Sequence, residues 1–159
     1  MRPLEVSFTV EERPFRLGGL IPVTVDLRAR RDVALRAGWV DLVCHEEWMA
    51  NFVIDAPTSS RPMIVGGGGL PATVMPTPTA PRRVSEEMKQ TYVHSRLVFL
   101  DGLQLPEGSN VTYNPRLEIA PDPPDHVAVS TVTWKLALVI DLPHALDVHR
   151  ARPVEVDLD

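Results

Sequence analysis

Residues 43–48 place a cysteine, a histidine and two glutamates side by side, in the order Val-Cys-His-Glu-Glu-Trp. Thiolate, imidazole and carboxylate groups bind metals and exchange protons. In a β-strand, neighbouring side chains point to opposite faces, so Cys44 and His45 do not converge on one ion. His45 and Glu47 share a face, but two ligands do not complete a zinc site. We therefore interpret Cys44 as a buried structural residue that behaves as a small hydrophobe.

A second cluster of reactive groups is the sequence Asp-Pro-Pro-Asp-His at Asp122 to His126. A hydrolytic triad also needs a nucleophile and an oxyanion hole. Ser130 follows closely, but its flanking residues do not form a nucleophile elbow. The prolines here are typical of a crossing between strands. We expect no catalytic, metal-binding or cofactor-binding residues. A metal-dependent or hydrolytic enzyme built on this corner stays as an alternative.

Residues 55–85 form a long segment rich in glycine and proline, with Gly66-Gly67-Gly68-Gly69 and a proline run at 75–81. No Lys-Ser or Lys-Thr follows the glycines, as a phosphate-binding loop requires. Proline runs adopt the polyproline II conformation and dock into aromatic grooves of other proteins. We interpret the segment as an insertion that a folded core does not need. Its candidate partner-binding residues are Met63, Ile64, Val65, Pro76, Pro78, Pro81, Arg82 and Arg83.

The elements that must position these residues are strands, because apolar and polar residues alternate with a period of two. The alternation predicts strands at 4–10, 21–28, 38–48, 88–99, 111–119, 133–140 and 154–158. Within 38–48 it places Val40, Leu42 and Cys44 on the apolar face. Within 88–99 we expect Val93, Ser95, Leu97 and Phe99 to point inward and His94 and Arg96 to point outward.

Glycine and proline lie mainly between these segments, and no long amphipathic helix is evident. About seven turn-bounded strands predict an all-β fold, an immunoglobulin-like antiparallel β-sandwich. We expect one domain covering residues 1–159, with the insertion at about 55–85.

Composition excludes several function classes. The net charge of −5 argues against nucleic-acid binding, which normally needs a basic surface. A single cysteine rules out an intrachain disulfide. The start lacks the apolar region of a signal peptide, and no apolar run reaches the ~20 residues of a membrane span. We expect a cytoplasmic protein without a membrane span.

Several stretches resemble the N-terminal domain of the arrestin superfamily. They are Phe15 to Leu27, with a glycine turn that leads into a strand; Val33 to Val43; Leu105-Pro-Glu-Gly; Pro123-Pro124 through Thr133 to Asp141; and Arg152-Pro-Val-Glu-Val156. Trp134 stands at a position that is usually tyrosine, and Asp125-His126 replace a usual serine. The superfamily includes arrestins, α-arrestins and a bacterial sporulation-control family.

The resemblance implies an arrestin N-domain type of sandwich and a non-enzymatic scaffold or adaptor without a cofactor. Such a module binds protein partners, either by strand addition at an open sheet edge or through the long loop. Two alternatives remain open: the enzyme at the Asp122–His126 corner, and a structural subunit of a homomeric assembly.

Overall fold

The structure is a computed structural model that describes residues 2–54, 82–124 and 130–159. Its strands are β1 (Leu4–Val10), β2 (Pro14–Arg16), β3 (Leu20–Ala29), β4 (Val33–Ile54), β5 (Arg82–Leu105), β6 (Asn110–Tyr113), β7 (Arg116–Glu118), β8 (Thr131–Asp141) and β9 (Val148–Asp157). They form two units: residues 1–48 with 89–159, and residues 49–88. No described helix is long and apolar enough to cross a membrane.

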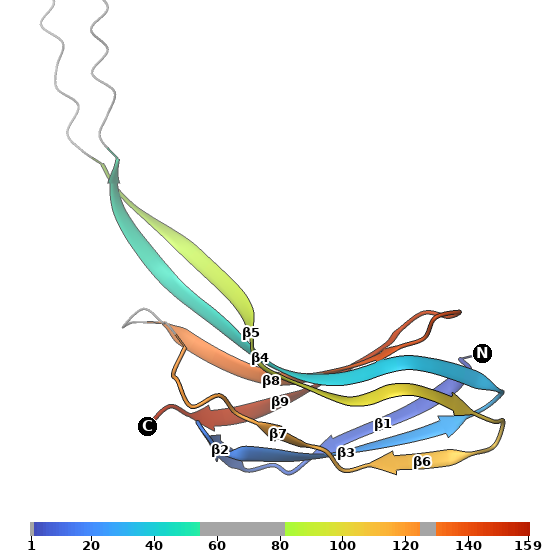
Figure 1. The fold of residues 1–159 in the computed structure, drawn as a ribbon. Helices are drawn as coiled ribbons and strands as arrows, with labels where there is room; N and C mark the ends of the chain where they lie inside the picture. Colours follow the sequence, from blue (N-terminus) through green and yellow to red (C-terminus); the bar gives the residue numbers. More distant parts are fainter. Residues whose placement is uncertain (1, 55–81, 125–129) are drawn as a thin grey trace, which may run out of the picture. The chain divides into compact units, whose positions relative to one another are not determined.

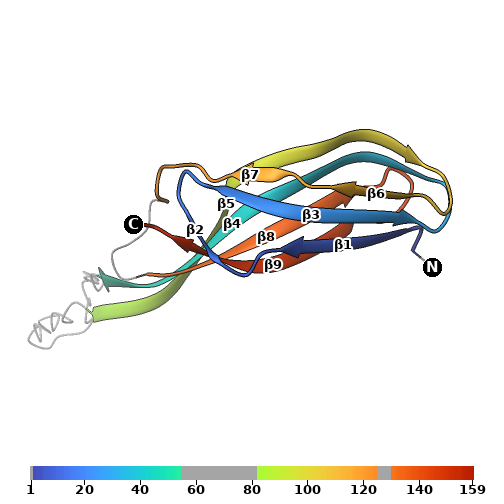
Figure 2. The same cartoon turned by 90° about the horizontal axis from the view of Figure 1, so that it is seen from below.

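The first unit is a sandwich of two sheets, which Figures 1 and 2 show as two layers. One sheet has the order β1-β3-β6, with β7 also paired to β3. The other has the order β2-β9-β8-β4-β5. The prediction of an all-β sandwich is confirmed. One pair departs from the antiparallel pattern, because β2 runs parallel to β9.

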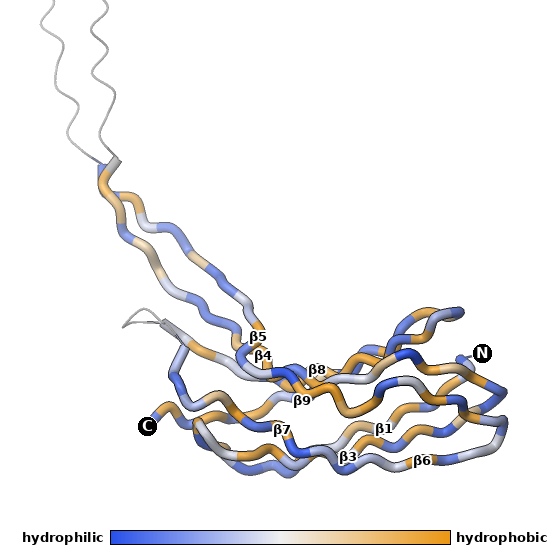
Figure 3. The backbone as a smooth tube through the Cα atoms, viewed as in Figure 1, coloured by the Kyte–Doolittle hydropathy of each residue, from blue (hydrophilic) through white to orange (hydrophobic). Residues whose placement is uncertain are grey.

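The core lies between the sheets and follows the predicted alternation. Along β3, the odd-numbered residues from Ile21 to Ala29 are at most 2% exposed. Figure 3 shows the same alternation of hydrophobic and hydrophilic residues along the strands. Phe8 of β1 and Leu136, Leu138 and Ile140 of β8 complete the centre of this core. Cys44 and Trp134, which face each other in the β4–β8 register, lie at one end of it.

Turns at both ends of the first sheet use glycine where the backbone requires it. Gly18 has a φ of +76° before β3, and its N–H donates to the carbonyl of Ile119 at 2.9 Å. Gly108 has a φ of +80°, and Ser109 N–H donates to Pro106 O at 3.1 Å, as expected of a type II turn. These turns fix the ends of β3, β5 and β6.

Four details differ from the sequence-based prediction. The strand expected at 111–119 is divided into β6 and β7, because Pro115 between them has no N–H to donate. The three-residue β2 was missed, since it is too short to show a period. Residues 82–85, at the end of the range expected for the insertion, are the start of strand β5.

The fourth difference is the orientation of β5. Val93 is 47% exposed, so its expected inward position is wrong. His94 points inward instead, and its ring packs nearly perpendicular to that of Trp134, with 5.3 Å between centroids. Leu97 and Phe99 pack on the core as predicted, and Arg96 points outward. His94 and Leu97 both point inward although they are three residues apart. In a regular strand, residues an odd number apart point to opposite faces, so the alternation is interrupted here, as at a β-bulge.

Candidate interaction surface

The cysteine–histidine–glutamate stretch is divided between the two faces of β4. Cys44 is 0% exposed, which confirms its predicted burial, and Glu46 on the same face is 1% exposed. Burial raises the pKa of the Cys44 thiol; a hydrogen bond with Tyr92 opposes this shift and the charge of Glu46 adds to it. A thiol with a raised pKa is a weak nucleophile and a weak ligand at neutral pH. Cys44 is therefore a core residue.

His45 and Glu47 lie on the outer face and form a chain of polar contacts with β5. His45 Nδ1 lies 2.7 Å from Thr91 Oγ1, and His45 Nε2 lies 3.0 Å from Glu47 Oε1. Lys89 Nζ lies 3.8 Å from the same carboxylate oxygen. The hydrogen bond from His45 is the main cause that lowers the pKa of Glu47.

A hydroxyl, an imidazole and a carboxylate in a row have the outline of a hydrolytic triad. Catalysis would also require a pocket that holds substrate beside the hydroxyl. Among the described residues, the four best-formed surface hollows are not lined by His45, Glu47 or Thr91. We interpret this row of polar contacts as a structural link between β4 and β5.

An ion pair between exposed Arg96 and buried Asp41 makes a second link between the same strands. Arg96 Nε donates to Asp41 Oδ1 at 2.6 Å, and Arg96 Nη2 donates to Asp41 Oδ2 at 2.9 Å. The guanidinium also lies 5.6 Å from the ring centroid of Trp39. The hydrogen bonds and the charge of Asp41 raise the pKa of Arg96. Asp41 is only 6% exposed, so this bidentate pair anchors the edge strand of the larger sheet.

The Asp122–His126 corner gains no catalytic partner from the described residues. Asp122 is exposed and Pro124 is buried, while Asp125 and His126 lie outside the described part of the chain. The Ser130 hydroxyl is buried, so it is not presented to a substrate. Within residues 2–54, 82–124 and 130–159, no three metal-binding side chains gather at one point.

The largest of the four hollows borders β1. It has a volume of about 790 Å³. We call it the β1 groove; its lining includes Arg2, Glu5, Arg28, Arg30 and Arg150, together with Asp26 and Asn110. Arg30 pairs with Glu5. Arg2 and Arg28 make no ion pair with any residue that the structure describes, so two guanidinium groups remain available for an anionic ligand.

The strands explain why these arginines meet. In the β1–β3 register, Glu5 lies opposite Arg28 and Leu4 opposite Ala29, which brings the two chain segments together. Arg150 comes from β9 of the other sheet. The sequence shows Arg28 and Arg30 as neighbours of a turn, but it gives no sign that Arg2 and Arg150 join them. That convergence depends on the pairing of β1 with β3 and on the stacking of the sheets.

The partner-binding residues predicted from sequence fall into two groups. Those from Met63 to Pro81 lie outside the described residues: Met63, Ile64, Val65, Pro76, Pro78 and Pro81. Arg82 and Arg83 are described, and both are exposed at the start of β5. The hypothesis that the loop contacts a partner therefore remains a prediction.

Comparisons with known proteins identify a similar fold. No family model matches the chain, and no curated protein matches its sequence. The structure is similar to that of Spo0M, a sporulation control protein from Bacillus subtilis, with a TM-score of 0.64 and 12% sequence identity. The match covers 100% of this chain and 51% of that chain, so this chain spans about half the length of Spo0M. The similarity supports the predicted arrestin-like fold, and at this identity it concerns the fold alone.

Proposed function

We propose that this protein is a non-enzymatic binding module that takes an extended, acidic segment of a partner protein against the free edge of β1. The observation that carries the proposal is the position of β1, the seven-residue edge strand of its sheet, which among the described strands pairs only with β3. An edge strand presents unpaired N–H and C=O groups, and these form hydrogen bonds with an added strand.

The β1 groove supports an acidic partner. Four arginines and two acidic residues line it, whereas the whole chain carries a net charge of −5. A local excess of positive charge attracts anionic segments even on a protein whose net charge is negative. Main-chain hydrogen bonds would supply affinity that is independent of sequence, and the unpaired Arg2 and Arg28 would select carboxylates.

A peptide-binding experiment tests this function. Random peptides of about ten residues are selected for binding to the full chain, and hydrogen exchange is then measured with and without the selected peptides. We expect acidic sequences that slow exchange of amides in β1. Arg28→Glu should weaken binding, because a carboxylate then faces the acidic peptide.

Arg116→Glu is the matched control. Arg116 is an exposed arginine of the same sheet that lines a second hollow, which borders Thr9 and Val10 at the far end of β1 from Arg2, so it tests whether the position of the charge matters. The control should bind the selected peptides as the wild type does. Equal affinity for Arg28→Glu and the wild type, or protection confined to strands other than β1, would contradict the proposal. Binding that requires residues 57–81 would favour the loop instead.

A further inference from the structure

The second unit leaves a two-stranded ribbon without a third strand. It consists of the end of β4 from Met49 and the start of β5 up to Met88. Ser85 Oγ donates to Asn51 Oδ1 across the ribbon at 2.6 Å. The pairing of β4 with β8 ends at Glu47, and β5 is the last strand of its sheet. Within the described residues, both edges of the ribbon are therefore open.

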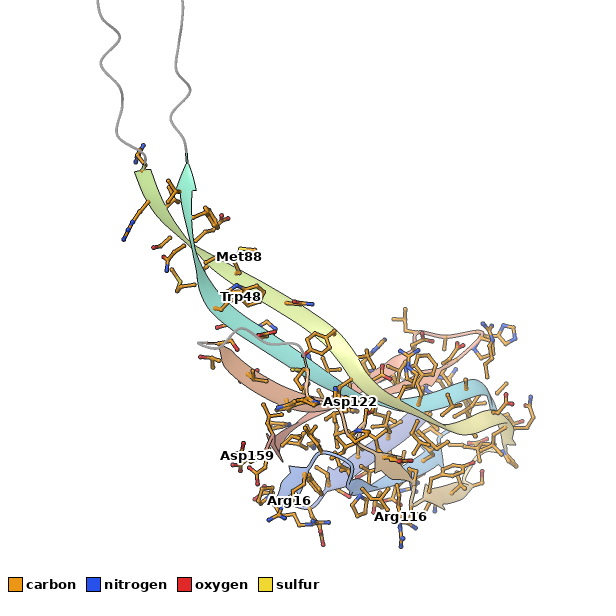
Figure 4. The ribbon with its side chains drawn as sticks, turned by 60° about the vertical axis from the view of Figure 1, so that its left-hand side comes forward. Arg16, Trp48, Met88, Arg116, Asp122 and Asp159 are labelled. Atoms are coloured by element: carbon orange, nitrogen blue, oxygen red, sulfur yellow. The ribbon has the colours of Figure 1, made fainter. Side chains whose placement is uncertain are left out.

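The ribbon also exposes large apolar side chains. Met49 and Val53 are each 57% exposed, Phe52 is 40% exposed and Met88 is 36% exposed. Figure 4 shows side chains projecting from both sides of the ribbon beyond the labelled Met88. An isolated two-stranded hairpin is marginally stable in water, and further strands are needed to stabilise it. The composition of the ribbon thus favours a partner strand.

The charges along β5 indicate which partner strand would pair with its open edge. The segment reads Arg82-Arg83-Val84-Ser85-Glu86-Glu87, so each arginine precedes a glutamate by four residues. An antiparallel copy of the same segment reverses this order. With the twofold axis at Val84, Arg82 lies opposite the partner's Glu86, and Val84 lies opposite the partner's Val84. Arg82, Val84 and Glu86 share one face of the strand, as a twofold axis perpendicular to a sheet requires.

We infer that two copies of this chain associate through the open edge of β5, with antiparallel pairing centred on Val84. The result is a four-stranded sheet with the order β4-β5-β5-β4 across the two copies. The twofold axis produces each Arg82–Glu86 pair twice, and the two Val84 side chains meet at the centre. The opposite edge, formed by Met49–Ile54 of β4, carries no charged residue and so has no charge pattern to set a register.

Charge reversal tests the inferred dimer. Sedimentation equilibrium of the full chain over a range of concentrations should show a monomer–dimer equilibrium. Arg82→Glu alone, or Glu86→Arg alone, places like charges opposite each other twice and should raise the dissociation constant by about tenfold or more. The double variant, Arg82→Glu with Glu86→Arg, restores the opposite charges and should restore dimerisation. Arg116→Glu changes the net charge by the same amount as Arg82→Glu, but at a site outside the ribbon, so it should leave the dissociation constant of the dimer nearly unchanged.

Cysteine cross-linking tests the register. Val84→Cys places two thiols opposite each other, with Cβ atoms about 4.5–5.5 Å apart, and should form an intermolecular disulfide under mild oxidation. Ser85→Cys places the thiols on diagonal positions about 7–8 Å apart and should cross-link poorly. The native Cys44 is buried and does not compete.

Three results would overturn the inference. They are a chain that stays monomeric at every concentration, a dimer that is indifferent to both charge reversals, and cross-linking that is no faster at position 84 than at 85. A dimer indifferent to the reversals would point to the β4 edge. None of these results bears on peptide binding at β1, so the proposed function is tested separately.

Discussion

At the scale of single residues, Trp134 shows how one side chain closes an end of the core. It is 7% exposed, lies opposite Cys44 in the β4–β8 register and contacts the His94 ring at nearly a right angle. Trp134→Ala should lower the free energy of unfolding by about 3–5 kcal/mol, since it removes a large buried side chain and leaves a cavity. Urea denaturation of the variant and the wild type measures this difference in the free energy of unfolding.

Trp39 provides the matched control for that substitution. It lies half-buried on the outer face of the same sheet, beside Arg96. Trp39→Ala should cost clearly less, because solvent fills the space that the ring leaves. Equal losses for the two variants would show that Trp134 does not occupy the core.

We expect Glu47 to make a pH-dependent contribution to stability. Its hydrogen bond with His45 lowers its pKa in the folded state, below the value of about 4.3 in unfolded chains. A lowered folded-state pKa stabilises the fold above the unfolded pKa, and this contribution is lost as pH falls through the folded-state pKa. Glu47→Gln removes the titrating group, so its urea midpoint should fall less than that of the wild type between about pH 5 and pH 3.

The control for the acid prediction is Glu118→Gln. The Glu118 carboxylate is exposed on β7 and makes no ion pair with the described residues. This variant should lose stability on acidification as the wild type does. If Glu47→Gln also follows the wild type, the His45–Glu47 hydrogen bond does not persist in solution.

At the scale of elements, β4 approaches β5 and β8 closely at Gly38. A Cβ added there would lie 3.0 Å from Phe99 Cζ, 3.1 Å from Ile140 Cδ1 and 3.2 Å from Leu100 Cβ. Gly38→Ala should therefore destabilise the protein by about 1–3 kcal/mol, because a packed core resists added volume. Thermal or urea unfolding detects the loss.

A second substitution shows whether crowding is the cause. Phe99→Leu removes the atom that lies nearest to the added methyl group. The double variant, Gly38→Ala with Phe99→Leu, should be more stable than the sum of the two single effects predicts. Additive effects would mean that the backbone moves to admit the alanine.

The strands also show what the sequence could predict and where it failed. Alternation located β1, β3 and β8 well, because each keeps one face buried throughout. It failed in β5 between His94 and Leu97, since a bulge changes which face the later residues occupy. In that region, side chains bind the backbone of Ala120: Ser95 Oγ accepts its N–H at 2.9 Å, and His94 Nε2 lies 2.9 Å from its carbonyl oxygen. Such contacts depend on the tertiary structure, so the alternation of apolar and polar residues in the sequence cannot predict them.

The candidate surface was less accessible to sequence analysis than the fold. Arg82 and Arg83 were singled out as partner-binding residues, and the charge order that follows them supports a role in self-association. The β1 groove was not anticipated, because Arg2 and Arg150 are distant in sequence and meet only across two sheets. A surface made by sheet stacking cannot be found from strand patterns alone.

At the scale of the whole molecule, the buried core and the ribbon fall in different units. Every residue of the buried core cluster lies between Leu4 and Cys44 or between Leu100 and Val156, within the first unit. The ribbon contributes none of them. The groove at β1 and the open β5 edge of the ribbon therefore belong to different units, and the two interactions that we propose should be independent.

Excision of the ribbon tests this separation. Residues 49–87 are replaced by Asn-Gly, which forms the tight turn of a two-residue hairpin. Glu47 and Lys89 already lie side by side, so the turn joins strand segments that are neighbours. Shortening a loop changes stability by roughly 1 kcal/mol or less on entropy alone, so we expect a cooperative unfolding transition close to that of the wild type.

The excised protein should be monomeric by sedimentation and should still bind acidic peptides through β1. Loss of cooperative unfolding would show that residues 49–87 support the core. A dimer that persists would place self-association in the sandwich, and loss of peptide binding would move the partner site into the excised segment.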